Sequence, residues 1–342
     1  MSTSMRRSDW LQLTQEAALE PELPIVDPHH HLWDVPANRE QRYLLDELLE
    51  DIGGSGHNVR ATVFMECMAM YRANGPASMR PVGETEFVNG VAAMSASGIY
   101  GDIRACAAIV SFADLALGAR VGEVLDAHMA ASPRFRGIRH ACGWDASEQI
   151  RNSHTKPVAH LLDDATFRAG FAQLAARNLS FDAWLYHPQI PELTRLAQTF
   201  PDTVIVFDHF GGPLGIGPYA GLRDEIFTQW RKDVSALASC ENVVAKLGGL
   251  VMPINGFGFH KQAAPPDSET IARTTRDYYL HMIDEFGPDR CMFESNFPVD
   301  KVSCSYGVLW NVFKRITHDF SEADKAALYH DTAVRIYNVD RG

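Results

Sequence analysis

The sequence predicts a single-domain (β/α)8 TIM barrel, and three observations support this fold. Eight short apolar segments rich in β-branched residues recur along the chain, each followed by a longer segment with helical spacing of its apolar residues. The repeat averages about 40 residues per unit, over a chain of ordinary barrel length. Near-continuously apolar strands in βα order are typical of a parallel sheet covered by helices. An open α/β sheet remains the alternative, although no G-x-G-x-x-G turn of a dinucleotide-binding fold follows a strand.

The expected strands set the order of the elements. They occupy residues 23–26, 59–67, 103–110, 135–140, 179–185, 203–209, 243–247 and 291–294. Helical patterns between them include residues 84–97, 117–131, 164–178 and 190–200. We therefore assign residues 23–342 to the barrel domain. Residues 1–22 match none of these patterns and form an N-terminal arm, which we expect to pack on a neighbouring subunit.

Composition excludes several classes of partner. The 342-residue chain carries 31 Lys and Arg against 43 Asp and Glu, a net charge of −12, so we expect a small-molecule substrate and neither nucleic acid nor anionic membrane. Six scattered cysteines without a C-x-x-C pair indicate reduced thiols. The sequence contains neither an apolar stretch of the roughly 18 to 20 residues that span a membrane nor the apolar core of a signal peptide. We expect a cytoplasmic protein and, as the common default, a homodimer.

Polar residues stand at the C-terminal ends of the expected strands, where a buried strand has no structural need for them. In a barrel these ends converge on one face, which carries the catalytic residues. We therefore expect one pocket that contains His29, His31, Glu66, Arg139, His140, Asp182, His187, Asp208, His209, Lys246, Glu294 and Asn296.

The stretch VDPHHHLWD places three consecutive histidines at the end of the first strand. Side chains alternate along a strand, so His29 and His31 share one side and His30 points the other way. An H-x-H pair can supply two imidazoles to one divalent metal, or two hydrogen-bonding groups to one anion. His29 and His31 are therefore the candidate working pair, and both uses remain open.

Five motifs, in their order along the chain, resemble the amidohydrolase-2 family of TIM-barrel hydrolases. They are IVDPHHHLW, FRGIRH, VIVFDHFGGP, VVAKLGGL and RCMFESNFPVDK. Within the family, the match is to the branch of sugar lactonases and 2-pyrone-4,6-dicarboxylate lactonase. The resemblance implies roles for His29, His31, His209 and Arg139. Some relatives bind one zinc or manganese ion, whereas the pyrone lactonase works without a metal, so the resemblance leaves the cofactor open.

The chain departs from this family at the eighth strand. Relatives usually read G-S-D-W-P there, and their aspartate is a general base or a metal ligand, whereas this chain reads E-S-N-F-P. The amide of Asn296 is not basic, so we expect it to donate a hydrogen bond instead. Glu294 lies two residues earlier, on the same side of an extended strand, and Glu66 adds another acid after the second strand. We expect Glu294 or Glu66 to activate water. The alternative is that Glu294 only pairs with a buried cation.

Other residues suggest how a substrate is held. Arg139 and Lys246, with His140 and Asp182 beside them, suit an anionic, carboxylated substrate. His187 is a third candidate metal ligand, and equally a cap for the helix that follows it. Residues 248–270 are too rich in glycine, proline and aromatics for a helix, so we expect a lid that places His260 over the substrate, or a contact between subunits.

Three functions fit these observations. The first is hydrolysis of a lactone, or of another cyclic or activated acyl compound that carries a carboxylate. The second is a lyase that releases CO2 from an aromatic or unsaturated acid, because decarboxylases of the wider superfamily resemble this chain. The third is a barrel without catalytic activity that binds a carboxylated metabolite.

Overall fold

The computed structural model describes residues 6–339 and confirms the predicted barrel. Eight parallel strands form one sheet in sequence order. They are β1 (Pro24–His30), β2 (Asn58–Met65), β3 (Arg104–Ser111), β4 (Phe135–Ile138), β5 (Ser180–Ala183), β6 (Ile205–Phe207), β7 (Val243–Leu247) and β8 (Cys291–Phe293). The ends of the sheet meet where His31 N donates to Phe297 O at 2.8 Å and Asn296 N donates to His29 O at 2.9 Å. The barrel is therefore nearly closed.

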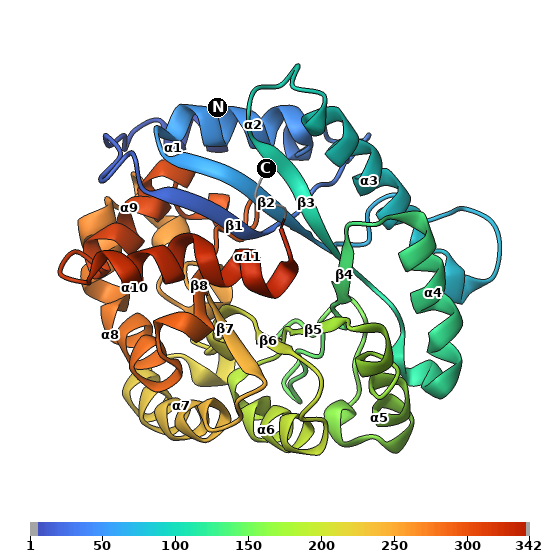
Figure 1. Cartoon of the computed structure of the whole chain (residues 1–342). Helices are drawn as coiled ribbons and strands as arrows, with labels where there is room; N and C mark the ends of the chain where they lie inside the picture. The colour runs from blue at the N-terminus through green and yellow to red at the C-terminus, as the bar shows by residue number, and fades with distance from the viewer. Residues whose placement is uncertain (1–5, 340–342) are drawn as a thin grey trace.

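Helices surround the strands, as Figure 1 shows. They are α1 (Arg7–Leu11), α2 (Leu45–Ser55), α3 (Val82–Ala96), α4 (Val121–Ala131), α5 (Ala165–Phe171), α6 (Ile190–Thr199), α7 (Arg223–Ala238), α8 (Ser268–Phe286), α9 (Tyr306–Ile316), α10 (Glu322–Ala326) and α11 (Thr332–Tyr337), with a π-helical segment at Ala327–Asp331. None of the helices in this part of the chain is long and apolar enough to cross a membrane.

The first strand is longer than its apolar residues predicted. It continues to His30, which pairs with Phe64 of β2, so the polar histidines remain part of the sheet. His30 turns away from its neighbours, and its Nε2 shares a hydrogen bond of 2.8 Å with Thr62 Oγ1. The predicted separation of His30 from His29 and His31 is therefore confirmed.

The inside of the barrel is apolar at the N-terminal end of the strands and polar at the other end. Side chains such as Val26, Val63, Val206 and Val244 form the apolar cluster, together with Tyr337 of α11. In Figure 1, α11 crosses this end of the barrel. The polar end of the barrel is therefore formed by the residues that directly follow the strands.

The N-terminal arm lies against the barrel of its own chain. Trp10 is buried, and its Nε1 donates to Gln262 O at 3.1 Å. Thr14 Oγ1 donates to Pro265 O at 2.7 Å. Glu16 accepts from the backbone amide of Ser268 at the start of α8, at 2.7 Å. The arm thus follows the segment before α8 of its own chain, and its packing on a neighbouring subunit stays a prediction.

Candidate active site

Glu294, directly after β8, joins two histidines at the polar end of the barrel. Its Oε1 shares a hydrogen bond of 2.6 Å with His209 Nδ1, and its Oε2 lies 2.7 Å from His29 Nδ1. All three side chains are buried. Burial raises the pKa of Glu294 to about 8 and lowers the pKa of His209 to about 3. Both rings are held by Nδ1, which leaves Nε2 of each ring for another partner.

His29 and His31 face one another, with 3.3 Å between their Nε2 atoms. His31 Nδ1 lies 2.9 Å from the Met65 carbonyl oxygen, which can only accept, so the His31 proton is on Nδ1. Arg139 Nη1 donates towards His29 Nε2 at 3.2 Å, and Lys246 Nζ lies 3.4 Å from His29 Nδ1. The closest contact of Nδ1 is Glu294 Oε2 at 2.7 Å, so we assign the His29 proton to Nδ1. Two imidazole lone pairs therefore point into the same space.

Arg139 and Glu66 form a buried ion pair beside these histidines. Arg139, directly after β4, donates from Nε to Glu66 Oε1 at 2.8 Å and from Nη2 to the Glu66 carbonyl oxygen at 2.6 Å. His154 Nε2 lies 3.1 Å from the other carboxylate oxygen. Burial acts to raise the pKa of Glu66, but Arg139 and His154 bring it down to about 2. Glu66 is therefore ionised, and both of its carboxylate oxygens have partners.

Lys246 and Asp182 form a second buried ion pair, next to Asp208. Lys246 Nζ donates to Asp182 Oδ1 at 2.7 Å and lies 3.5 Å from Asp208 Oδ1. Within residues 6–339, neither carboxylate oxygen of the fully buried Asp208 accepts a hydrogen bond. Burial raises the pKa of Asp208 to about 6, against the opposing charge of Lys246. A buried carboxylate without a donor is suited to receive a cation, a proton or a water molecule.

Two glycines after β7 make room for the acid and the histidine. A Cβ atom on Gly248 would collide with Cγ of Glu294. Gly249 has a φ of +74°, and a Cβ atom there would lie 2.5 Å from His209 Nδ1. The two glycines of the motif VVAKLGGL therefore allow β7 to approach the centre of the site closely.

The donor set fits a divalent cation. His29, Asp208 and His209 offer ligand atoms that all lie within 4.8 Å of one another. The 3.3 Å between the Nε2 atoms of His29 and His31 matches two nitrogen ligands of one tetrahedral zinc, which lie about 3.3 Å apart for bonds of about 2.0 Å. The group that would hold the ion is therefore His29, Asp208 and His209, and His31 lies outside this group although its Nε2 faces that of His29.

The charges of the buried side chains also favour a bound cation. Three buried carboxylates, Glu66, Asp182 and Asp208, share the two buried cations Arg139 and Lys246. Glu294 adds a further buried carboxylate, which contacts histidines. Carboxylates therefore outnumber the permanent cations in this region. Without such an ion, the raised pKa values of Glu294 and Asp208 indicate that protons balance the charge instead.

The structure gives Asn296 a partner outside the cluster of histidines. Its Nδ2 donates to Asp300 Oδ1 at 3.2 Å. We expected Asn296 to share one side of the strand with Glu294, but β8 ends at Phe293 and Asn296 has a left-handed φ of +53°. Because the strand has ended, its alternation no longer determines where this side chain points.

Three further histidines that we expected in the site make other contacts. His140 Nδ1 accepts from the backbone amide of Leu115 at 3.3 Å, and its ring lies against two phenylalanine rings. His187 Nδ1 accepts from the backbone amide of Leu214 at 3.2 Å. His187 is outside the group of possible ligands around His209. His260 lies beside the N-terminal arm, close enough for a cation of the arm to lower its pKa, although burial has the larger effect.

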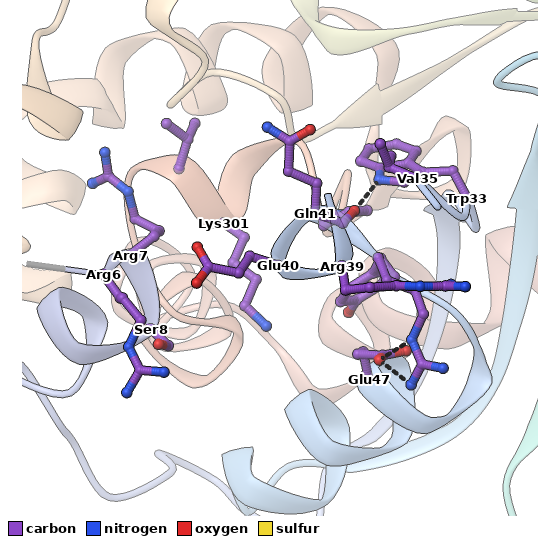
Figure 2. Close-up of a pocket in the computed structure, with 14 residues that line it drawn as sticks. Arg6, Arg7, Ser8, Trp33, Val35, Arg39, Glu40, Gln41, Glu47 and Lys301 are labelled. Atoms are coloured by element: carbon purple, nitrogen blue, oxygen red, sulfur yellow. Dashed lines mark hydrogen bonds and ion pairs between the residues drawn. The ribbon is translucent and has the colours of Figure 1, made fainter. Parts of the chain in front are cut away.

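A cavity of about 790 Å3 opens beside Trp33. The Trp33 ring stacks on the His31 ring, with 5.9 Å between ring centroids, and Trp33 Nε1 donates to Gln41 O at 2.7 Å. Figure 2 shows the N-terminal arm on one side of the cavity and the segment after β1 on the other. Its lining includes five cations and two carboxylates, namely Arg6, Arg7, Arg39, Arg42 and Lys301 against Glu40 and Glu47.

Two of the residues that shape the site had no expected role. Asp208 stands at the end of β6, next to His209, and that position alone distinguished it from other aspartates. His154 lies in the irregular segment between β4 and β5, where the sequence shows no periodicity. Its contact with Glu66 becomes visible only once the loop is folded over the barrel.

Comparison with known proteins supports the same architecture. A family model described as Amidohydrolase matches residues 26–339. The uncharacterized protein y4mH of Sinorhizobium fredii is 34% identical over 343 aligned residues, which cover 93% of this chain and 99% of that protein. The L-fucono-1,5-lactonase of Burkholderia multivorans is 28% identical over 235 residues, which cover 68% of this chain and 71% of the lactonase.

A solved structure also resembles this chain. It is an amidohydrolase of Burkholderia multivorans with bound zinc, which has a TM-score of 0.70 and 25% sequence identity. The alignment covers 92% of this chain and 99% of the solved one.

Proposed function

This chain belongs to the amidohydrolase family, and we propose that it is a hydrolase that opens a lactone or a related cyclic or activated acyl compound. It is an enzyme of the amidohydrolase superfamily. The proposal depends on the contact of Glu294 with both His29 and His209, beside Asp208, whose carboxylate oxygens accept no hydrogen bond within residues 6–339. The similarity to L-fucono-1,5-lactonase supports the lactone class.

The imidazoles present Nε2 acceptors, which can hold a cation but cannot donate to a carbonyl oxygen, so they act on the reacting carbonyl group through the ion that they hold. A divalent ion such as zinc or manganese, held by His29, His209 and Asp208, would supply Lewis-acid polarisation of the reacting carbonyl group. Glu294 fixes the proton of His209 on Nδ1 and that of His29 on Nδ1, so both rings present Nε2 to the pocket. Burial of these groups excludes bulk water and strengthens their electrostatic effect.

Asp208 is the best-placed acceptor for the proton of the attacking water. The water oxygen forms a bond to the carbonyl carbon while its proton passes to Asp208, and that proton then reaches the ring oxygen as the acyl C–O bond breaks. The product is the open hydroxy acid. We suggested Glu294 and Glu66 for this step from the sequence, but both Glu66 oxygens and Glu294 Oε1 already take part in hydrogen bonds, and Glu294 Oε2 lies 2.7 Å from His29 Nδ1. Asp208 has only longer ion pairs, 3.5 Å to Lys246 and 3.8 Å to Arg139, and neither of its oxygens accepts a hydrogen bond within residues 6–339. The geometry therefore favours Asp208 as the base.

We place the substrate's own carboxylate in the cavity beside Trp33. Arg139 and Lys246 were the expected partners, but each already contacts a buried carboxylate. Cations outnumber carboxylates in the lining of this cavity. Arg39 and Lys301 pair with Asp34 and Asp51 outside the lining, whereas Arg7 has no ion pair within residues 6–339. Trp33 separates this cavity from His31, so its ring would have to move for a substrate to reach both.

A panel of lactones with and without a carboxylate tests the activity, with acid release measured at constant pH. The Asp208→Asn variant should lose about 100-fold or more in kcat. Asp126→Asn is the matched control, because Asp126 pairs with Arg177 at the surface. Full activity in Asp208→Asn would remove Asp208 from the role of base. If no lactone is hydrolysed and an aromatic acid releases CO2, the decarboxylase alternative replaces the proposal.

A second measurement tests the position of the carboxylate. The Arg7→Gln variant should raise KM for carboxylated lactones and leave KM for neutral lactones unchanged. Arg60→Gln is the control, because Arg60 is an exposed arginine of β2 outside the lining of this cavity. Equal effects on both lactone classes would argue against a carboxylate in the cavity.

We also propose that the enzyme works in the cytoplasm as a homodimer. The reducing compartment is supported by six free cysteines, five of them buried. Light scattering on the purified protein should give a mass of twice 38.0 kDa. A mass of 38.0 kDa would show a monomer.

A further inference from the structure

Tyr337 enters the barrel from the end opposite to the catalytic histidines. It is the last residue of α11, which crosses the N-terminal ends of the strands (Figure 1). The fully buried side chain packs in the apolar cluster inside the barrel. Arg136 Nε donates to the Tyr337 carbonyl oxygen at 2.9 Å, which ties the end of the helix to β4. The phenol hydroxyl therefore reaches the polar half of the barrel from the N-terminal ends of the strands.

Tyr337 and Lys246 share one oxygen of Asp182. The Tyr337 hydroxyl donates to Asp182 Oδ1 at 2.5 Å, and Lys246 Nζ donates to the same atom at 2.7 Å. Nζ also lies 5.1 Å from the centre of the Tyr337 ring. An oxygen that already accepts a short O–H bond has less negative charge to offer a second donor. The hydroxyl thus weakens the hold of Asp182 on Lys246.

Lys246 has a second carboxylate within reach. Its Nζ lies 3.5 Å from Asp208 Oδ1 and 3.4 Å from His29 Nδ1. An ammonium that stays near Asp208 neutralises the carboxylate that the candidate cation site needs. An ammonium drawn fully to Asp182 leaves that carboxylate free.

We propose that Tyr337 is a positioning residue whose hydroxyl sets how Lys246 is shared between Asp182 and Asp208. It thereby controls how strongly Asp208 binds a cation. Tyr337 itself lies below the site and contacts no reacting atom. The proposal rests on the cation site of the proposed function and is independent of the substrate.

The affinity for zinc tests this proposal without any enzymatic assay. Zinc is titrated against a competing chelator with the wild-type protein and with Tyr337→Phe, which keeps the ring and removes only the hydroxyl. Lys246 should move to Asp182, so zinc should bind about three- to tenfold more tightly. Asp182→Asn should act in the opposite direction, because Lys246 then has only Asp208 as a carboxylate partner.

Tyr329→Phe is the matched control. Its buried hydroxyl lies 2.9 Å from Thr317 Oγ1, away from Lys246, so its loss should leave zinc affinity unchanged. Opposite shifts in Tyr337→Phe and Asp182→Asn are the result that a general loosening of the barrel would not produce. Unchanged or weaker zinc binding in Tyr337→Phe would overturn the proposal.

A crystal structure of Tyr337→Phe gives a second, metal-independent readout. The distance from Lys246 Nζ to Asp208 Oδ1 should exceed the present 3.5 Å. An unchanged distance would overturn the positioning role. If the wild-type protein takes up no zinc, the cation site of the proposed function fails, and this distance still decides the role of Tyr337.

Discussion

Glu294 and His209 are joined by a hydrogen bond of 2.6 Å between Oε1 and Nδ1. The bond holds the ring of a residue whose backbone φ is +54°, in the left-handed region. A non-glycine residue keeps such a conformation only where its surroundings impose it. The backbone turn after β6 and the side chain of Glu294 therefore both determine the orientation of the His209 ring.

Replacing Glu294 by glutamine should weaken zinc binding and lower kcat, each by about 10- to 100-fold. An amide can accept from one Nδ1–H group, but its NH2 group then faces the other. Zinc titration and steady-state rates measure both effects. Glu285→Gln is the control, because Glu285 contacts His281 at the partly exposed end of α8. Wild-type zinc affinity in Glu294→Gln would show that the acid does not orient these rings.

Zinc binding should release protons near neutral pH. Burial raises the pKa of Glu294 to about 8 and that of Asp208 to about 6, so metal-free Glu294 is mostly protonated at pH 7. The zinc-bound site needs both carboxylates ionised. Affinity should therefore rise about tenfold per pH unit between about pH 6 and pH 8, more steeply below pH 6 where Asp208 is protonated as well, and level off above pH 8. Calorimetry in buffers of different ionisation enthalpy counts the protons, and no release near pH 7 would contradict this assignment.

Removal of the Arg139 guanidinium should destabilise the fold. Arg139→Met leaves the buried carboxylate of Glu66 without its main partner, which costs about 3 to 5 kcal/mol in the free energy of unfolding. Urea denaturation measures the loss. Arg177→Met is the control, because its surface pair with Asp126 contributes about 1 kcal/mol or less. Equal losses in the two variants would mean that burial of the Arg139 pair has no special effect.

Gly249→Ala should impair the site more than Gly258→Ala, although both glycines have nearly the same φ, +74° and +73°. The new Cβ at Gly249 would push against His209, whereas nothing lies within 4 Å of one at Gly258. The strain of a positive φ is common to both variants, so the difference in zinc affinity reports the contact with His209. Equal affinities in the two variants would exclude that contact as a determinant of the site.

The fold could be predicted because the barrel strands are buried on both faces. Segments such as TVIVFDH and VVAKL are apolar almost throughout, and they stand out from the amphipathic helices between them. The end of β1 was predicted too early, because its last residues are histidines that remain paired with β2. A rule based on apolar residues cannot include polar residues that a neighbouring strand holds in place.

Only the local part of the site could be predicted. Alternation along one strand brings His29 and His31 together, and both belong to one short motif. The partners of the acids come from distant segments without a pattern of their own. His154 reaches Glu66 from an irregular loop, and Tyr337 reaches Asp182 from the far end of the chain. Asp208 accepts no hydrogen bond within the described residues. This property depends on which carboxylates pair with Arg139 and Lys246 in the folded protein, and the sequence does not show that pairing.

The position of α11 links the last described helix to the interior of the barrel. His30 of β1 forms a bridge with Phe297 in the segment after β8, and the last turn of α11 supplies the Tyr337 hydroxyl to Asp182. A variant that lacks α11 would keep all eight strands but expose Asp182 and Lys246 from the N-terminal end of the barrel.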